Sequence, residues 1–162
     1  MEQVTDEASK NYVGDGGPGA APASLKLLIK KLHKDAKLPT RAYAGDAGLD
    51  LYSVESKSLG RGSSGEFHTG IAVEIPYGYF GLMGTRSSFG KDGLFIHPGV
   101  IDAGYRGELT VFIRNHGRDF DVLKGYKIAQ LLILPVPNIE LVETTTLNPS
   151  SRGERALGSS GR

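Results

Sequence analysis

Residues 70–83 read Gly-Ile-Ala-Val-Glu-Ile-Pro-Tyr-Gly-Tyr-Phe-Gly-Leu-Met. Two short apolar runs, 70–75 and 79–83, are separated by the turn signal Pro76-Tyr77-Gly78. Apolar runs of about four to eight residues that are bounded by proline and glycine are typical of β-strands. The stretch therefore predicts two strands joined by a tight turn.

The same pattern continues on both sides of this stretch, from residue 40 to residue 137. Further apolar runs occur at 49–52, 109–113 and 128–134, and glycine-containing turn signals separate them. No convincing amphipathic helix lies between these runs. Many short strands at this spacing predict an all-β fold, as a sandwich, a jelly roll or a barrel.

Three segments of different composition frame the β region. Residues 24–37 fit either a strand or one face of a helix, and Pro39 ends both patterns. Residues 1–23 are rich in glycine, proline and alanine, and they hold too few apolar side chains to offset the entropy of ordering. We therefore expect a flexible leader at 1–23, a folded domain at 24–148 and a mobile C-terminal arm at 149–162.

Composition excludes several classes of function. The chain has 162 residues and no cysteine, so it holds no disulfide scaffold, thiol nucleophile or zinc–cysteine site. Its 19 Lys and Arg against 18 Asp and Glu lack the basic excess typical of nucleic-acid binding, and no apolar run approaches the roughly 18 residues of a membrane span. The four histidines lack metal-ligand spacing, so we expect no metal site built from protein ligands. We expect a soluble intracellular protein, cytoplasmic or nuclear, with no nucleic-acid or membrane partner.

Two polar clusters have the chemistry of phosphate binding. Arg86-Ser87-Ser88 follows the strand that ends at Met83, and it combines a planar guanidinium with hydroxyl donors. Arg152 precedes the donor-rich tail Gly158-Ser159-Ser160-Gly161. Each cluster has a simpler interpretation. The first fits a polar surface loop, and the second fits a disordered terminus.

Two further features suit a nucleotide site. Residues 101–107 are interpreted as a hairpin turn in which Asp102 and Tyr105 place a carboxylate beside an aromatic ring, although turns favour Asp and Gly in any case. Gln130 interrupts the apolar run at 128–134, so it either faces outward or finds a hydrogen-bond partner. Each signal is weak by itself.

Taken together and in this order, the clusters resemble the five motifs of the trimeric deoxyuridine triphosphatase (dUTPase) family. The matching segments are 44–53, 84–88, 99–109, 125–131 and 152–161. The third reads Gly-Val-Ile-Asp-Ala-Gly-Tyr-Arg-Gly-Glu-Leu and the fourth Gly-Tyr-Lys-Ile-Ala-Gln-Leu, and these two are the most specific. The resemblance covers about residues 25–161.

The resemblance implies a distorted jelly-roll β-barrel that assembles as a homotrimer with shared active sites. It implies hydrolysis of dUTP to dUMP and pyrophosphate, by in-line attack of water on the α-phosphorus. Mg²⁺ would be carried mainly on the substrate triphosphate, consistent with its preference for phosphate and water ligands. Such an activity limits uracil in DNA and supplies dUMP for thymidylate synthesis.

The resemblance also implies roles for single residues. Asp102 is expected to activate the attacking water as a general base, Arg86 to hold phosphates, and Asp50 to act through water near Mg²⁺. Tyr105 is expected to pack against the deoxyribose and exclude a ribose hydroxyl. The remaining substrate contacts are expected from Ser87, Ser88, Gly99, Ile101, Gln130, Arg152, Leu157, Gly158, Ser159 and Ser160.

The fifth motif departs from the family pattern. Arg155, Ala156 and Leu157 stand where the family carries two glycines and an aromatic residue. Leucine covers a base without stacking, which forfeits about 0.5–1.5 kcal/mol. This departure motivates an alternative, a dUTPase-fold nucleotide-binding or regulatory module with weak catalysis. A related deoxycytidine triphosphate deaminase is a third hypothesis, which the third motif and the tail disfavour.

Overall fold

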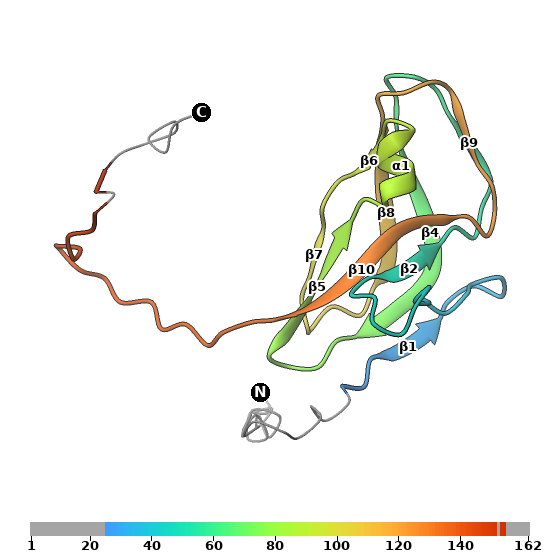
Figure 1. Cartoon of the computed structure of the whole chain (residues 1–162). Helices are drawn as coiled ribbons and strands as arrows, with labels where there is room; N and C mark the ends of the chain where they lie inside the picture. Colours follow the sequence, from blue (N-terminus) through green and yellow to red (C-terminus); the bar gives the residue numbers. More distant parts are fainter. Residues whose placement is uncertain (1–24, 152, 155–162) are drawn as a thin grey trace, which may run out of the picture.

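The structure is a computed structural model that describes residues 25–151, 153 and 154. In this part of the chain nearly all regular structure is β, which confirms the predicted fold class (Figure 1). The elements are β1 (Leu28–Lys31), β2 (Leu49–Tyr52), β3 (Lys57–Leu59), β4 (Ser64–Glu74), β5 (Tyr79–Gly84), α1 (Ser87–Lys91), β6 (Leu94–Ile96), β7 (Val100–Ile101), β8 (Glu108–Asn115), β9 (Phe120–Val122) and β10 (Lys127–Pro135). Among the described residues, no helix is long and apolar enough to cross a membrane.

The strands form three antiparallel sheets. One has the order β1-β4-β8-β6, the second has the order β2-β10-β5-β7, and β3 pairs with β9 in the third. The ambiguous segment at 24–37 contains strand β1, whose Ile29 is opposite Val73 of β4. Pairing along this edge therefore selects the strand over the helix.

The stretch from 70 to 83 crosses between the two large sheets. Its first run lies in β4 and its second is β5, and the predicted turn between them has Gly78 at a φ of 81°. This left-handed conformation favours glycine. The turn thus carries the chain from one layer of the jelly roll to the other (Figure 1).

The prediction that residues 101–107 form a hairpin turn is wrong. Strand β7 before the turn pairs with β5, where Ile101 is opposite Gly81, whereas β8 after the turn pairs with β4 and β6. An apolar run indicates a strand without indicating its partner, because pairing depends on residues far away in the sequence. The turn therefore also connects the two sheets.

One apolar core lies between the sheets. In β8 the side chains of Leu109, Val111 and Ile113 are buried while the residues between them are less covered, as the period of two requires. Phe67 of β4 and Leu131 of β10 are completely buried in the same cluster. Burying each such side chain contributes about 1.5–3 kcal/mol, so this core fixes the strand ends that carry the polar clusters.

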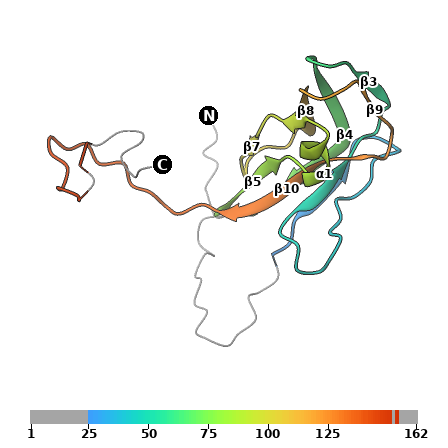
Figure 2. The ribbon, with the colours of Figure 1, turned by 45° about the horizontal axis from the view of Figure 1, so that its top comes forward.

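The predicted leader and most of the predicted arm lie outside the described residues. Strand β10 ends at Pro135, and residues 136–151 contain no strand. In two views this segment runs away from the body of the domain (Figures 1 and 2). The domain boundaries at 24–148 and 149–162 therefore stay a prediction.

Candidate functional site

Neighbouring strands of the second sheet bring three of the predicted site residues together. Gln130 of β10 is opposite Asp50 of β2 on one side and Gly84 of β5 on the other, and Arg86 follows two residues after Gly84. They line a cavity of about 380 Å³ that we call the Arg86 hollow. Its walls are Ala42, Asp46, Ala47, Gly48, Asp50, Arg86, Lys127, Gln130 and Leu132.

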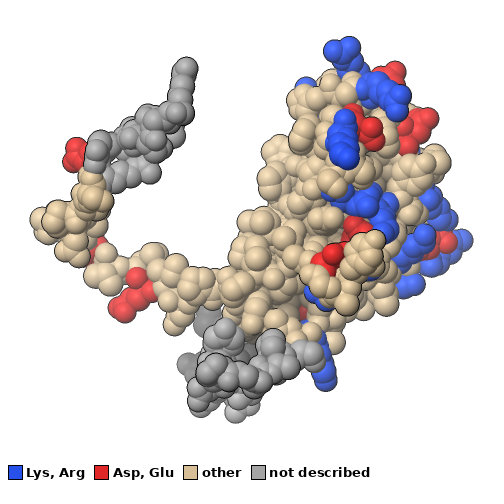
Figure 3. All heavy atoms as spheres, viewed as in Figure 1, with Lys and Arg blue, Asp and Glu red and all other residues tan. Residues whose placement is uncertain are grey.

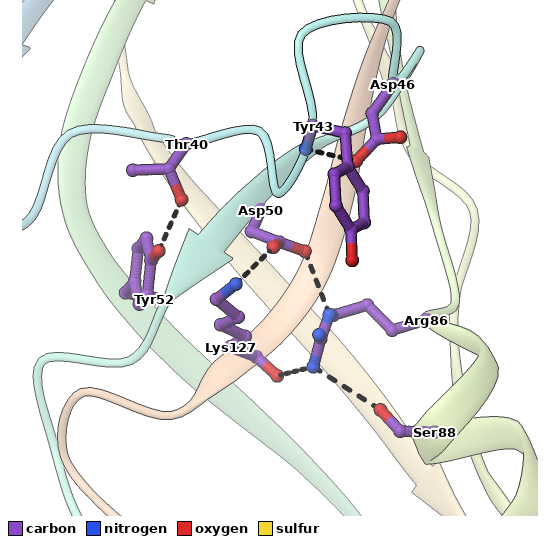
Figure 4. Close-up of polar contacts among 8 residues, drawn as sticks. All are labelled: Thr40, Tyr43, Asp46, Asp50, Tyr52, Arg86, Ser88 and Lys127. Carbon is purple, nitrogen blue, oxygen red and sulfur yellow. Dashed lines mark hydrogen bonds and ion pairs between the residues drawn. The ribbon is translucent and has the colours of Figure 1, made fainter.

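Asp50 forms an ion pair with a cation at each of its carboxylate oxygens. Arg86 Nε donates to Asp50 Oδ1 at 2.9 Å, and Lys127 Nζ lies 2.7 Å from Asp50 Oδ2. Only 8% of the Asp50 side chain is exposed, so these pairs are shielded from water. Figure 4 shows the carboxylate between the two cations. The hydrogen bond that the Lys127 ammonium donates to Asp50 raises the pKa of Lys127 and keeps the ammonium charged.

The guanidinium of Arg86 is held at further points. Arg86 Nη1 donates to the carbonyl oxygen of Lys127 at 3.0 Å and to Ser88 Oγ at 3.4 Å. Ser87 and Ser88 are exposed in the first turn of α1, which buried Phe89 anchors through an edge-to-face contact with Phe120. The predicted phosphate cluster is thus a fixed arginine beside two exposed hydroxyls.

Sequence reasoning did not single out Lys127, although the fourth motif contains it. The residue begins β10, where its backbone is opposite Tyr52. A lysine at the start of an apolar strand usually keeps its ammonium in water. The signal that distinguishes Lys127 is the position of Asp50 on the adjacent strand, which only the pairing of β2 with β10 provides.

The turn after β7 forms a second cavity of about 540 Å³, which we call the Asp102 hollow. The turn is held by Tyr105 N donating to the carbonyl oxygen of Asp102 at 3.0 Å. Arg106 Nη1 donates to the carbonyl oxygens of Ala103 and Tyr105 at 2.6 and 2.9 Å. The hollow is lined by Ser64, Met83, His97, Pro98, Gly99, Val100, Ile101, Asp102, Tyr105, Glu108, Leu109, Thr110, Phe112, Ile113 and Arg114.

The ring of Tyr105 has a defined position in this turn. Its hydroxyl donates to the carbonyl oxygen of Glu108 at 3.0 Å, and the ring lies so close to Gly107 that a Cβ there would collide with it. Gly99 similarly lies over the terminal methyl of Met83. The missing Cβ of Gly107 therefore allows the ring of Tyr105 to take this position.

The structure places the predicted site residues in two groups. Asp50, Arg86 and Gln130 line one hollow, with Ser87 and Ser88 beside it, and Gly99, Ile101, Asp102 and Tyr105 line the other. Among the described residues that line them, the two hollows share none. Arg152, Leu157, Gly158, Ser159 and Ser160 lie outside the described residues.

Comparison with known proteins identifies one family. The dUTPase family model matches residues 34–161. A deoxyuridine 5′-triphosphate nucleotidohydrolase of Clostridium tetani is 42% identical over 140 residues, which are 84% of this chain and 97% of that protein. The protein of the same name from Mycolicibacterium gilvum is 43% identical over 148 residues, which are 85% of this chain and 96% of that one.

Solved structures give the same family. The dUTPase of Staphylococcus bacteriophage 80alpha, solved with dUpNHpp, superposes with a TM-score of 0.80 at 33% identity and covers 85% of this chain and 99% of its own. A mutant dUTPase from phage phi11 of S. aureus, which coordinates a structural Mg(II) ion, superposes with a TM-score of 0.72 at 29% identity. That match covers 76% of this chain and 99% of the phage chain.

Proposed function

Because the chain belongs to the dUTPase family and hydrolyses dUTP to dUMP and pyrophosphate, we propose that the Arg86 and Asp102 hollows are two parts of its active site. One observation carries this proposal. Residues predicted to bind phosphate line the Arg86 hollow, whereas the predicted general base, Asp102, lines the other hollow. Family membership and the relatives' names favour hydrolysis over a binding module with weak catalysis.

Asp102 is the proposed general base. Its residue is exposed at the hollow, while backbone and Arg106 hydrogen bonds fix the turn around it. The carboxylate takes a proton from a water, and the oxygen of this water attacks the α-phosphorus. At the same time, the bond breaks between the α-phosphorus and the oxygen that bridges the α- and β-phosphates. Pyrophosphate leaves with the electron pair of the broken bond, and dUMP keeps the new oxygen.

The rest of the Asp102 hollow suits a deoxynucleoside. Backbone groups of Gly99 and Ile101 are proposed to hydrogen-bond the uracil edge, next to the apolar floor that Met83 supplies. The ring of Tyr105 is proposed to face the deoxyribose, leaving no room for a 2′-hydroxyl. Its hydrogen bond to Glu108 and its contact with Gly107 support this role, because they restrict the ring.

The Arg86 hollow is the proposed triphosphate site. Arg86 supplies a guanidinium that its neighbours hold in place, and Ser87, Ser88 and Gln130 supply hydroxyl and amide donors. Arg152, Ser159 and Ser160 are proposed to close over the γ-phosphate, with Leu157 and Gly158 over the base. This second set rests on the family pattern in the sequence.

The Arg86 hollow also fits Mg²⁺ bound to a triphosphate. Two carboxylates line it, those of Asp46 and Asp50. Mg²⁺ typically takes one or two carboxylates, keeps several waters and takes its remaining ligands from substrate phosphates. The dUTPase family uses magnesium, and when bound the ion neutralises charge that develops on the phosphates. We propose that the substrate carries it and that Asp50 contacts it through water.

The active site is proposed to form between copies of the chain in a homotrimer. The separation of the two hollows supports this assembly, because a second copy can bring its Asp102 hollow to the Arg86 hollow of the first.

Residues 136–151 also support this assembly, because the large side chains of Ile139, Leu141 and Leu147 are 68%, 92% and 88% exposed. This segment carries Glu140 and Glu143 but no Lys or Arg, whereas the Lys and Arg side chains visible on the body lie with Asp and Glu mainly along its right side (Figure 3). The segment is therefore suited to pack on a neighbouring copy.

Steady-state kinetics with a panel of nucleotides test the proposed function. We expect Mg²⁺-dependent release of pyrophosphate from dUTP, with kcat/KM for UTP, dTTP and dCTP lower by about 10²-fold or more. The extra 2′-hydroxyl of UTP and the extra methyl of dTTP should collide with the fitted site, whereas dCTP should leave the groups that hydrogen-bond uracil unpaired. Removing Mg²⁺ with EDTA should abolish the activity, and adding it back should restore it. Equal rates with dUTP and UTP would contradict the role given to Tyr105, and ammonia release from dCTP would indicate a deaminase.

A further inference from the structure

Lys127 contacts the Arg86 hollow through two different atoms. Its ammonium binds Asp50 Oδ2 at 2.7 Å, and its carbonyl oxygen accepts the hydrogen bond from Arg86 Nη1 at 3.0 Å. The side chain is 34% exposed, whereas that of its partner Asp50 is 8% exposed. Lys127 therefore links the start of β10 to the buried carboxylate of Asp50 (Figure 4).

These contacts form a closed ring of three residues. Asp50 Oδ1 holds Arg86 Nε, Asp50 Oδ2 holds Lys127 Nζ, and the Lys127 backbone holds Arg86 Nη1. Among the described residues, no hydrogen-bond partner is found for Arg86 Nη2. The ring thus holds the guanidinium at Nε and Nη1 and leaves Nη2 for an incoming ligand.

The charge of Lys127 has a consequence for how Arg86 binds phosphate. A buried carboxylate needs a compensating charge, because water cannot solvate it. If Lys127 were neutral, Arg86 alone would balance Asp50, and the carboxylate would compete with phosphate for the same guanidinium. With Lys127 paired to the second oxygen, Arg86 has positive charge in excess of what Asp50 requires.

We propose that Lys127 is a positioning residue for dUTP hydrolysis, which holds and neutralises Asp50 so that Arg86 presents Nη2 to the triphosphate. The inference rests on the phosphate role proposed for Arg86. Lys127 itself does not touch the substrate in this account. Direct contact between its ammonium and a phosphate is the competing possibility, which the experiment separates.

The test uses the full chain with Lys127→Met, a variant that removes the charge and keeps much of the stem. We expect kcat/KM for dUTP to fall about 10- to 100-fold and the affinity for dUpNHpp to fall with it, the scale of a charge-assisted hydrogen bond. Lys127→Arg should recover activity to within about threefold of the unmodified protein, because it restores the charge beside Asp50. If the Met variant does not fold, Lys127→Gln takes its place with the same expectation.

Lys124→Met is the matched control. Lys124 lies three residues earlier and also pairs with a carboxylate, that of Asp35, at 2.6 Å, yet neither residue lines the Arg86 hollow. We expect its kcat/KM to stay within about twofold of the unmodified protein, as for an exposed ion pair. An equal loss in both lysine variants would overturn the inference, because it would reflect a general effect of surface charge.

A double-mutant cycle with Asp50→Asn separates positioning from direct contact. If Lys127 acts through Asp50, Lys127→Met should lower dUpNHpp affinity by less than about twofold in the Asp50→Asn background. Additive losses would overturn the inference and assign Lys127 to the phosphate. If Lys127→Met is as active as the unmodified protein while Arg86→Gln is impaired, the inference about Lys127 is overturned and the phosphate role of Arg86 stands. An unimpaired Arg86→Gln variant overturns the phosphate role of Arg86 as well.

Discussion

Replacing Asp102 by Asn should lower kcat for dUTP hydrolysis by about 10²- to 10⁴-fold, the usual contribution of a general base. Asparagine keeps the size of the side chain and removes the carboxylate that takes the proton from water. The backbone of the turn is held by Tyr105 and Arg106, so the shape of the hollow should persist. Dissociation constants for dUpNHpp should therefore change by less than about threefold.

Asp92→Asn is a suitable control for this variant. Asp92 is exposed at the end of α1 and lines neither hollow, so its kcat should equal that of the unmodified protein. Undiminished pyrophosphate release by the Asp102 variant would show that another group activates the water. A parallel loss of turnover and dUpNHpp binding would indicate that Asp102 acts in binding instead.

Replacing Arg86 by Gln should lower kcat/KM by about 10²- to 10³-fold, the scale measured when one preorganised donor to a developing charge is removed. The change removes the guanidinium that both Asp50 and Lys127 hold at the edge of the hollow. It also leaves Asp50 with one cation, which costs about 1–3 kcal/mol of folding free energy. Stopped-flow measurement of dUpNHpp binding and thermal unfolding together resolve these two effects.

Arg86→Lys separates the charge of this residue from its geometry. Lysine supplies a point charge without the planar fork, so it cannot hold Asp50 and a phosphate at the same time. We expect this variant to keep most of the folding free energy and to lose at least about tenfold in kcat/KM. Full activity in Arg86→Lys would contradict the account of a guanidinium fixed at Nε and Nη1.

The strands that contain an apolar run follow from the sequence. The run at 49–52 is strand β2 in full, and the run at 128–134 lies inside β10. Their apolar residues and the turn residues around them are local signals that a single chain displays. The short strands β3, β6 and β9 carry too few residues to show a period, so they depend on partners for their definition.

The site was predicted less completely than the fold. Family motifs in the sequence name Asp50, Arg86, Asp102 and Gln130, yet they do not show that these residues fall into two separate hollows. That separation follows from β7 pairing with β5, which the hairpin interpretation missed. The role of Lys127 likewise requires the register of β10 on β2. Long-range pairing thus decides which polar residues meet, and no local pattern encodes it.

Mixing two inactive variants tests the proposed sharing of the active site between copies most directly. Asp102→Asn and Arg86→Gln chains are unfolded together, refolded together and assayed for dUTP hydrolysis. If each site takes its Asp102 and its Arg86 from different copies, random assembly should give about one intact site in four and recover about a quarter of the unmodified kcat per site. Activity no greater than the sum of the two variants refolded separately would contradict the account and place both residues in a site within one chain.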